Sequence, residues 1–136
     1  MAAVAEATRS ATVPDWVWRS RDWAPAIHLL YSDMLRDKLR PGDVDFEGTD
    51  PEGIGRPGIW WDRIRARSGV WSTGEQLFLD LAQELYNRGA QVRLADLLGS
   101  LDERYWRIAM EAVYFKRYGR RGAAVFGFGF PLEGTP

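Results

Sequence analysis

The sequence contains no cysteine and only one histidine, His28, among its 136 residues. The first absence excludes disulfides, thiolate metal sites and a cysteine nucleophile, and the second excludes a metal site built from several histidines. No apolar run approaches the ~18–20 residues of a membrane span. Residues 1–13 lack the basic segment and apolar stretch of a secretion signal. We therefore expect a soluble, cytoplasmic protein that needs no metal or cofactor.

Neither sign of charge is in excess, because 18 Lys and Arg stand against 19 Asp and Glu, a net charge of −1. This balance argues against a surface built throughout for nucleic acid or anionic lipid, although it is compatible with local basic patches. Lysine is scarce, since Lys38 and Lys116 are the only two beside 16 arginines. Codon bias in a high-GC bacterial genome accounts for that ratio, and selection of arginine for forked hydrogen bonds is the alternative.

The length and the apolar periodicity predict a mainly α protein with one small domain of four or five short helices. We expect helices at 25–40, 59–67, 73–88 and 102–118, and one helical turn at 95–98. The segment 16–18 is expected to be extended. The chain is thereby divided into a disordered tail at 1–13, a helical domain at 14–122 and an extended segment at 123–136.

The clearest helix start is Ser72-Thr73-Gly74-Glu75, which has the form of a capping box. Gly89 is a natural residue to follow the C-terminus of that helix. Asp102 is expected to cap the last helix, with Ser100 and Glu103 as a competing capping box.

Parts of this region resemble a known pattern. The stretch Trp71-Ser72-Thr73-Gly74-Glu75 to Leu81-Ala82, then Leu97-Leu98-Gly99-Ser100-Leu101-Asp102 and Ala112, is similar to small uncharacterised proteins of high-GC bacteria and their mobile elements. The matching residues are caps and core positions. The resemblance therefore implies a shared helical fold and carries no activity or site residues.

The segment 41–58 is a long loop rich in glycine, proline and acidic residues, and such loops are either functional or mobile. Residues 53–58 have the letters of a G-x-G-x-x-G motif, but not the strand before it and the βαβ unit that a dinucleotide site requires. Residues 43–48 resemble the first half of an EF-hand loop, yet Ile54 stands where the bidentate glutamate is needed. A solvated acidic loop is favoured, with a loose Mg²⁺ or Ca²⁺ site as the alternative.

Candidate catalytic groups are few. His28 lies at the edge of an apolar helical stripe, which is typical of a half-buried packing residue, and no serine lies in a nucleophile elbow. We therefore expect no catalytic residues and no enzymatic activity. A small hydrolase or metal-dependent enzyme that uses the carboxylates of 43–52 is the third alternative.

Two basic clusters are interleaved with aromatic residues, the combination that phosphate contacts and base stacking require. Their members are Arg63, Arg65 and Arg67 in one cluster and Lys116, Arg117, Arg120 and Arg121 in the other. Such cations also complement the dipole at a helix C-terminus, or pair with an acidic loop of the same chain. Nucleic-acid binding, in a protein of a phage, plasmid or defence system, is therefore the alternative function.

Phenylalanine and glycine alternate after the last helix, so Phe126, Phe128 and Phe130 would face one way in an extended segment. Glycine weakens strand formation, and the segment therefore needs support from its own core or from another chain. Trp16 and Trp18 flank the first helix and are further candidate contacts. The leading interpretation is a non-catalytic interaction module that binds another protein chain, or a second copy of itself, through these five rings.

Overall fold

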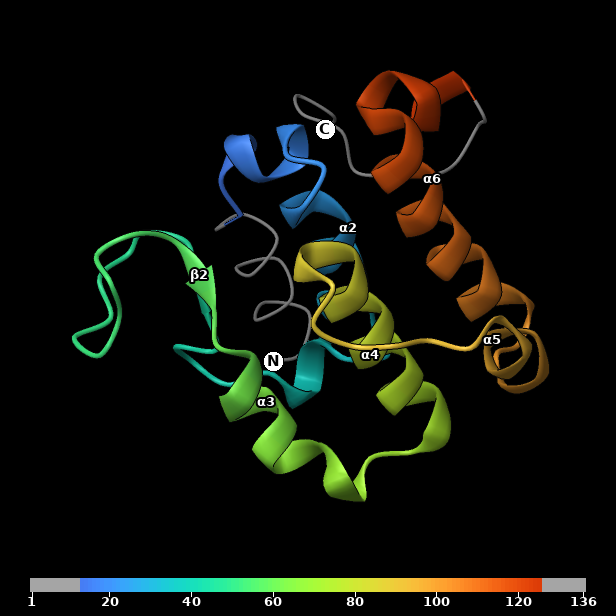
Figure 1. The fold of residues 1–136 in the computed structure, drawn as a ribbon, viewed down its shortest axis with the longest axis horizontal. Helices are drawn as coiled ribbons and strands as arrows, with labels where there is room; N and C mark the ends of the chain where they lie inside the picture. Colours follow the sequence, from blue (N-terminus) through green and yellow to red (C-terminus); the bar gives the residue numbers. More distant parts are fainter. Residues whose placement is uncertain (1–12, 126–136) are drawn as a thin grey trace.

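The structure, a computed structural model, describes residues 13–125. Its α-helices are α2 (Trp23–Leu30), α3 (Trp61–Arg67), α4 (Thr73–Asn87), α5 (Leu94–Ser100) and α6 (Glu103–Val125). Three short 3-10 helices accompany them: η1 (Asp15–Arg19), η2 (Arg36–Lys38) and η3 (Ser68–Val70). One two-stranded sheet pairs β1 (Val44–Asp45) with β2 (Gly58–Ile59). The predicted mainly α class is confirmed, and these elements form one small domain (Figure 1).

The core is organised around α2, which packs against both α4 and α6. Most of α2 is buried, because apolar residues surround the helix rather than forming one stripe. Phe78 and Leu81 of α4 and two alanines of α6, Ala109 and Ala112, belong to the same cluster. A second, smaller cluster joins Ala24, Phe115 and Trp18 where α2 passes the C-terminal half of α6. None of the helices in the part of the chain described is long and apolar enough to cross a membrane.

The capping box at the start of α4 is confirmed. The Glu75 backbone N–H donates to Ser72 Oγ at 3.2 Å, and the Ser72 N–H donates to Glu75 Oε1 at 2.8 Å. At the C-terminus of α4, the residue that ends the helix was predicted one position too late. Arg88, and not Gly89, adopts the left-handed conformation, with φ 60°. Asp102 caps α6, accepting the Tyr105 N–H at 3.0 Å.

The prediction that the first helix reaches Arg40 was wrong. Helix α2 ends at Leu30, and a turn follows in which Ser32 Oγ donates to the Leu29 carbonyl at 2.7 Å. A hydroxyl that bonds to a nearby carbonyl competes with the helical ladder, and the periodicity of leucines does not reveal this. Residues 16–18 are likewise helical, within η1, rather than extended. Ser20 Oγ then accepts the backbone N–H groups of Asp22 and Trp23 and so helps α2 to start.

The loop 41–58 contains more structure than predicted. Its ends pair as the antiparallel strands β1 and β2, with Val44 opposite Ile59 and Asp45 opposite Gly58. Ile59 therefore belongs to a strand and not to the predicted helix, which starts at Trp61.

The last helix breaks near the predicted position. Gly119 has φ 72° and ψ −170°, so the regular part of α6 ends after Tyr118, and a second helical segment continues to Val125. A glycine tolerates this left-handed φ because it has no Cβ. Helix α6 contacts η1, and the break in α6 and η1 lie toward the same end of the molecule in Figure 1.

Candidate functional site

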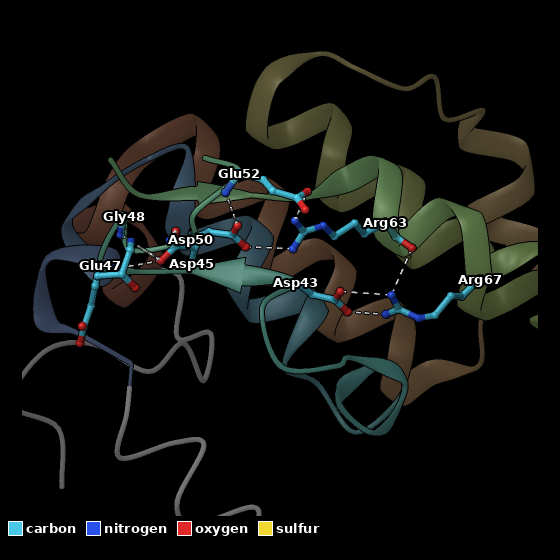
Figure 2. A network of polar contacts seen from close by, with 9 residues as sticks. Asp43, Asp45, Glu47, Gly48, Asp50, Glu52, Arg63 and Arg67 are labelled. Carbon is cyan, nitrogen blue, oxygen red and sulfur yellow. Dashed lines mark hydrogen bonds and ion pairs between the residues drawn. The ribbon is translucent and has the colours of Figure 1, made fainter. Parts of the chain in front are cut away.

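The acidic loop satisfies its own carboxylates. The Asp45 carboxylate accepts the backbone N–H groups of residues 47–50, at 2.9–3.3 Å, and closes the loop on itself (Figure 2). These hydrogen bonds, first of all the one from the Asp50 amide, hold the pKa of Asp45 below its usual range. Its oxygens are therefore occupied by loop amides. Among the described residues, no group of three or more side chains is placed to hold a metal ion.

The predicted cluster Arg63, Arg65 and Arg67 is paired with side chains of its own chain. Arg63 donates to Asp50 at 3.0 Å and to Glu52 at 3.2 Å (Figure 2). The Arg63 hydrogen bond lowers the pKa of the Asp50 carboxyl. The same guanidinium also stacks 3.9 Å from the centre of a Trp60 ring.

The other two arginines of α3 are paired as well. Arg65 donates to Asp80 at 2.9 Å and to Gln83 at 2.6 Å, which joins α3 to α4. Arg67 forms a two-pronged ion pair with Asp43, whose side chain is almost fully buried, and also donates to the Lys38 carbonyl. These three guanidiniums therefore fasten α3 to the loop and to α4.

The single histidine lies between two helices. His28 Nε2 of α2 is 2.9 Å from Glu111 Oε1 of α6, and both side chains are close to fully buried. Arg107 lies one helical turn before Glu111, with its Nε 3.9 Å from Glu111 Oε2. The pair links α2 to α6 inside the core, as expected of a packing histidine.

The second predicted cluster divides into two parts. Lys116 is paired with Asp22 at 2.6 Å, and the Arg117 guanidinium lies 5.8 Å from the centre of the Tyr118 ring. Arg120 and Arg121, after the break at Gly119, line a hollow in the surface.

This arginine hollow has a volume of about 550 Å³. Its lining residues come from two segments far apart in sequence: Arg19 and Arg21 at the corner between η1 and α2, and Tyr118, Gly119, Arg120 and Arg121 at the break in α6. The η1–α2 corner and the break in α6 thus place four arginines around one space.

Gly119 allows the two walls of the hollow to meet. A Cβ atom at this position would lie 3.0 Å from Nε and 3.1 Å from Nη2 of Arg21. Because φ is also positive, any other residue would be strained here, and the Arg21 guanidinium would have to shift by a few tenths of an ångström. The glycine therefore permits both the turn of the chain and the close approach of the guanidinium.

The hollow is lined by cations without a carboxylate among the residues that form it. Arg19, Arg21 and Arg121 are exposed, and within residues 13–125 none of the three has a carboxylate within ion-pair distance. Asp22, the acidic neighbour of Arg21, is paired with Lys116. Among the described residues, the charges of Arg19, Arg21 and Arg121 are therefore not neutralised by a carboxylate, in contrast to those of Arg63, Arg65 and Arg67 in α3.

Of the five aromatic residues predicted to bind a partner, the structure describes two, Trp16 and Trp18. Trp16 is 36% exposed and packs edge-on against Trp23, with 5.0 Å between ring centres, while Trp18 packs on the Phe115 cluster. Phe126, Phe128 and Phe130 lie outside the described residues. A partner at these rings stays a prediction.

Arg19 and Arg21 were missed by the sequence reasoning. A signal was present, because both follow the aromatic residues of Trp16-Val17-Trp18 in the same alternation of rings and cations that marked the other clusters. What the sequence could not supply was their closeness to residues 118–121, about a hundred positions away, which depends on the packing of η1 against α6.

Comparison of the chain with protein-family models, with curated proteins and with solved structures finds no match.

Proposed function

We propose that the protein is a non-catalytic nucleic-acid-binding module that holds backbone phosphates in the arginine hollow. The observation that carries the proposal is the convergence of Arg19, Arg21, Arg120 and Arg121 on one space without a lining carboxylate. Arginine suits this role because its planar guanidinium donates two parallel hydrogen bonds to a phosphate.

The charge distribution supports a local site rather than a basic surface. The whole chain has a net charge of −1, whereas residues 15–22 and 116–121 together hold six cations and two carboxylates. A polyanion would therefore be attracted to this end of the molecule, and phosphate binding would gain from the release of its condensed counterions. The arginines of α3 contribute nothing to this attraction, since carboxylates of the same chain neutralise them.

A binding role rather than catalysis is supported by the state of the reactive groups. The His28 imidazole and the Glu111 carboxylate are buried against each other, and the Asp45 oxygens accept four loop amides. These groups are committed to structure, and none of them lines the hollow.

The test compares two variants that lose equal charge. Arg19→Gln/Arg21→Gln/Arg121→Gln removes three guanidiniums from the hollow, whereas Arg56→Gln/Arg88→Gln/Arg93→Gln removes three exposed ones elsewhere. Affinity for a fluorescent oligonucleotide of about 15 residues, single- or double-stranded, is measured by anisotropy at about 0.1 M salt. Each phosphate contact is worth about fivefold at that salt concentration, so the hollow variant should bind about 100-fold more weakly.

The matched control should retain affinity within about threefold, because distant exposed charges are screened at this salt concentration. Circular dichroism verifies that both variants keep the helical fold. Equal weakening of the two variants, or a wild-type protein that binds neither form of the oligonucleotide, would contradict the proposal.

A second candidate function, protein binding through α5, is favoured by a separate observation. Leu94 and Leu98 are 62% and 61% exposed and lie four residues apart on one face of the helix, while Leu97 is buried in the core. An exposed leucine pair at this spacing is typical of a helix that packs into an apolar groove. If the partner is a second copy, sedimentation should show a dimer that Leu94→Ser/Leu98→Ser dissociates; a monomeric wild-type protein would exclude self-association.

A further inference from the structure

The lining of the arginine hollow includes one aromatic residue, Tyr118. Tyr118 lines the hollow together with four arginines and is 46% exposed. Its ring stacks on that of Tyr114, with centres 5.6 Å apart and planes inclined by 29°. Tyr114 is itself half-buried, so the Tyr118 ring is stacked on a ring that is partly packed into the protein.

We propose that the hollow takes a single-stranded nucleic acid, with one unpaired base stacked on the Tyr118 ring and the adjoining phosphates on Arg19, Arg21 and Arg121. This inference rests on the proposed function and specifies its ligand. A base has a flat face available for stacking on an aromatic side chain only when it has left its own helical stack.

The dimensions of the site fit this ligand. A hollow of about 550 Å³ lies within the range of cavities that enclose a small organic molecule, roughly 300–1,000 Å³, so one nucleotide can enter it. Phosphates on either side of that nucleotide would then meet the guanidiniums that rise from the η1–α2 corner and from the break in α6. The Arg117 guanidinium, 5.8 Å from the Tyr118 ring centre, adds positive charge next to the same stack.

Duplex DNA fits the structure less well. In helix-turn-helix proteins, the recognition helix lies in the major groove with its N-terminal residues against the base edges. The exposed helical segment before the long helix, α5, carries Asp96, and α6 begins with Asp102 as its cap and Glu103 in its first turn. These carboxylates would face the phosphates of a duplex and repel it.

The experiment compares wild type with Tyr118→Leu and Tyr118→Phe on three ligands: a labelled single strand of about 15 nucleotides, the duplex of the same sequence, and a mononucleotide as competitor. We expect tighter binding of the single strand than of the duplex, and a loss of about tenfold in single-strand affinity for Tyr118→Leu. Tyr118→Phe should restore affinity to within about twofold, because it keeps the stacking face. The duplex affinity should be the same in all three proteins.

Three results would overturn the inference while leaving the proposed function standing: duplex binding at least as tight as single-strand binding, a Tyr118→Leu variant with unchanged single-strand affinity, or a mononucleotide that competes at the concentration of the oligonucleotide. Failure of the proposed function looks different, because then the arginine variants bind every ligand as wild type does. Helical circular dichroism of Tyr118→Leu separates lost stacking from a lost fold.

Discussion

The backbone of Gly119 lies so close to the guanidinium of Arg21 that a Cβ atom on the glycine would be 3.0 Å from Arg21 Nε. Gly119 also has a positive φ of 72°, and it ends the regular part of α6. One residue thus sets both the direction of the chain after α6 and the position of a cation of the arginine hollow.

Replacement of Gly119 by alanine should therefore affect stability and binding together. A left-handed L-residue costs about 1–2 kcal/mol of unfolding free energy, and the new methyl group forces the Arg21 guanidinium to shift by a few tenths of an ångström. Denaturant unfolding measures the first effect and oligonucleotide anisotropy the second. Gly99→Ala is the control, because the Cβ at that helical position meets no other atom within 4 Å and its φ is not positive. Gly99→Ala should be neutral or stabilising, by up to about 1 kcal/mol, and a Gly119→Ala variant that behaves like it would contradict this account.

The buried ion pair between Asp43 and Arg67 should be a large contributor to stability. Asp43 is 2% exposed, and its carboxylate accepts hydrogen bonds from Nη1 and Nη2 of Arg67 and from the Arg40 backbone N–H. Asp43→Asn keeps the shape of the side chain but leaves the Arg67 guanidinium without its counter-charge. It should lower the free energy of unfolding, measured with denaturant, by about 3 kcal/mol.

The matched control for that substitution is Glu52→Gln. Glu52 pairs with Arg63 in the same loop but its side chain is 79% exposed, so its loss should cost less than about 1 kcal/mol. Equal costs for the two substitutions would show that the pair at Asp43 is no more desolvated than one at the surface.

The acidic loop should give stability a defined pH dependence. Loop amides lower the pKa of Asp45 and the Arg63 hydrogen bond lowers that of Asp50, both from an ordinary value of 3.8. A carboxyl with a depressed folded-state pKa stabilises the fold above its unfolded-state pKa, and that contribution is lost as the pH falls through the folded-state value.

Thermal unfolding of wild type and Asp45→Asn, compared from about pH 6 down to about pH 2, tests this sign. The wild-type protein should be the more stable of the two above about pH 4, and its advantage should shrink at each step below that pH. An advantage that stays constant with pH would mean that the ionised carboxylate does not close the loop.

The start of α4 should depend on one hydroxyl. Ser72→Ala removes the acceptor of the Glu75 N–H and should lower the free energy of unfolding by about 1 kcal/mol. Ser100→Ala is the comparison, because Asp102 and not Ser100 caps α6. A Ser100→Ala variant that is destabilised as strongly as Ser72→Ala would contradict the observed caps.

Elements marked by distinct capping or breaking residues were predictable from the sequence. The capping box at Ser72 and the glycine break after Tyr118 are encoded by neighbouring residues. The end of α2 was missed because the leucine periodicity continues past Leu30, through the turn in which Ser32 bonds to the Leu29 carbonyl. Contacts between distant segments were not predictable at the site. The neutralisation of Arg63 and Arg67, and the convergence of Arg19 and Arg21 with Arg120 and Arg121, arise from packing between segments that are distant in sequence.

The salt dependence of oligonucleotide binding tests the central claim most directly, because its slope counts the phosphates that the protein neutralises. Each single-strand phosphate contact contributes about −0.7 to the slope of log Kobs against log salt concentration. The three arginines replaced in Arg19→Gln/Arg21→Gln/Arg121→Gln should therefore flatten the wild-type slope by about 2, whereas Arg56→Gln/Arg88→Gln/Arg93→Gln should leave it unchanged. A wild-type slope near zero, or the same slope in the wild type and the hollow variant, would contradict phosphate binding by the arginine hollow.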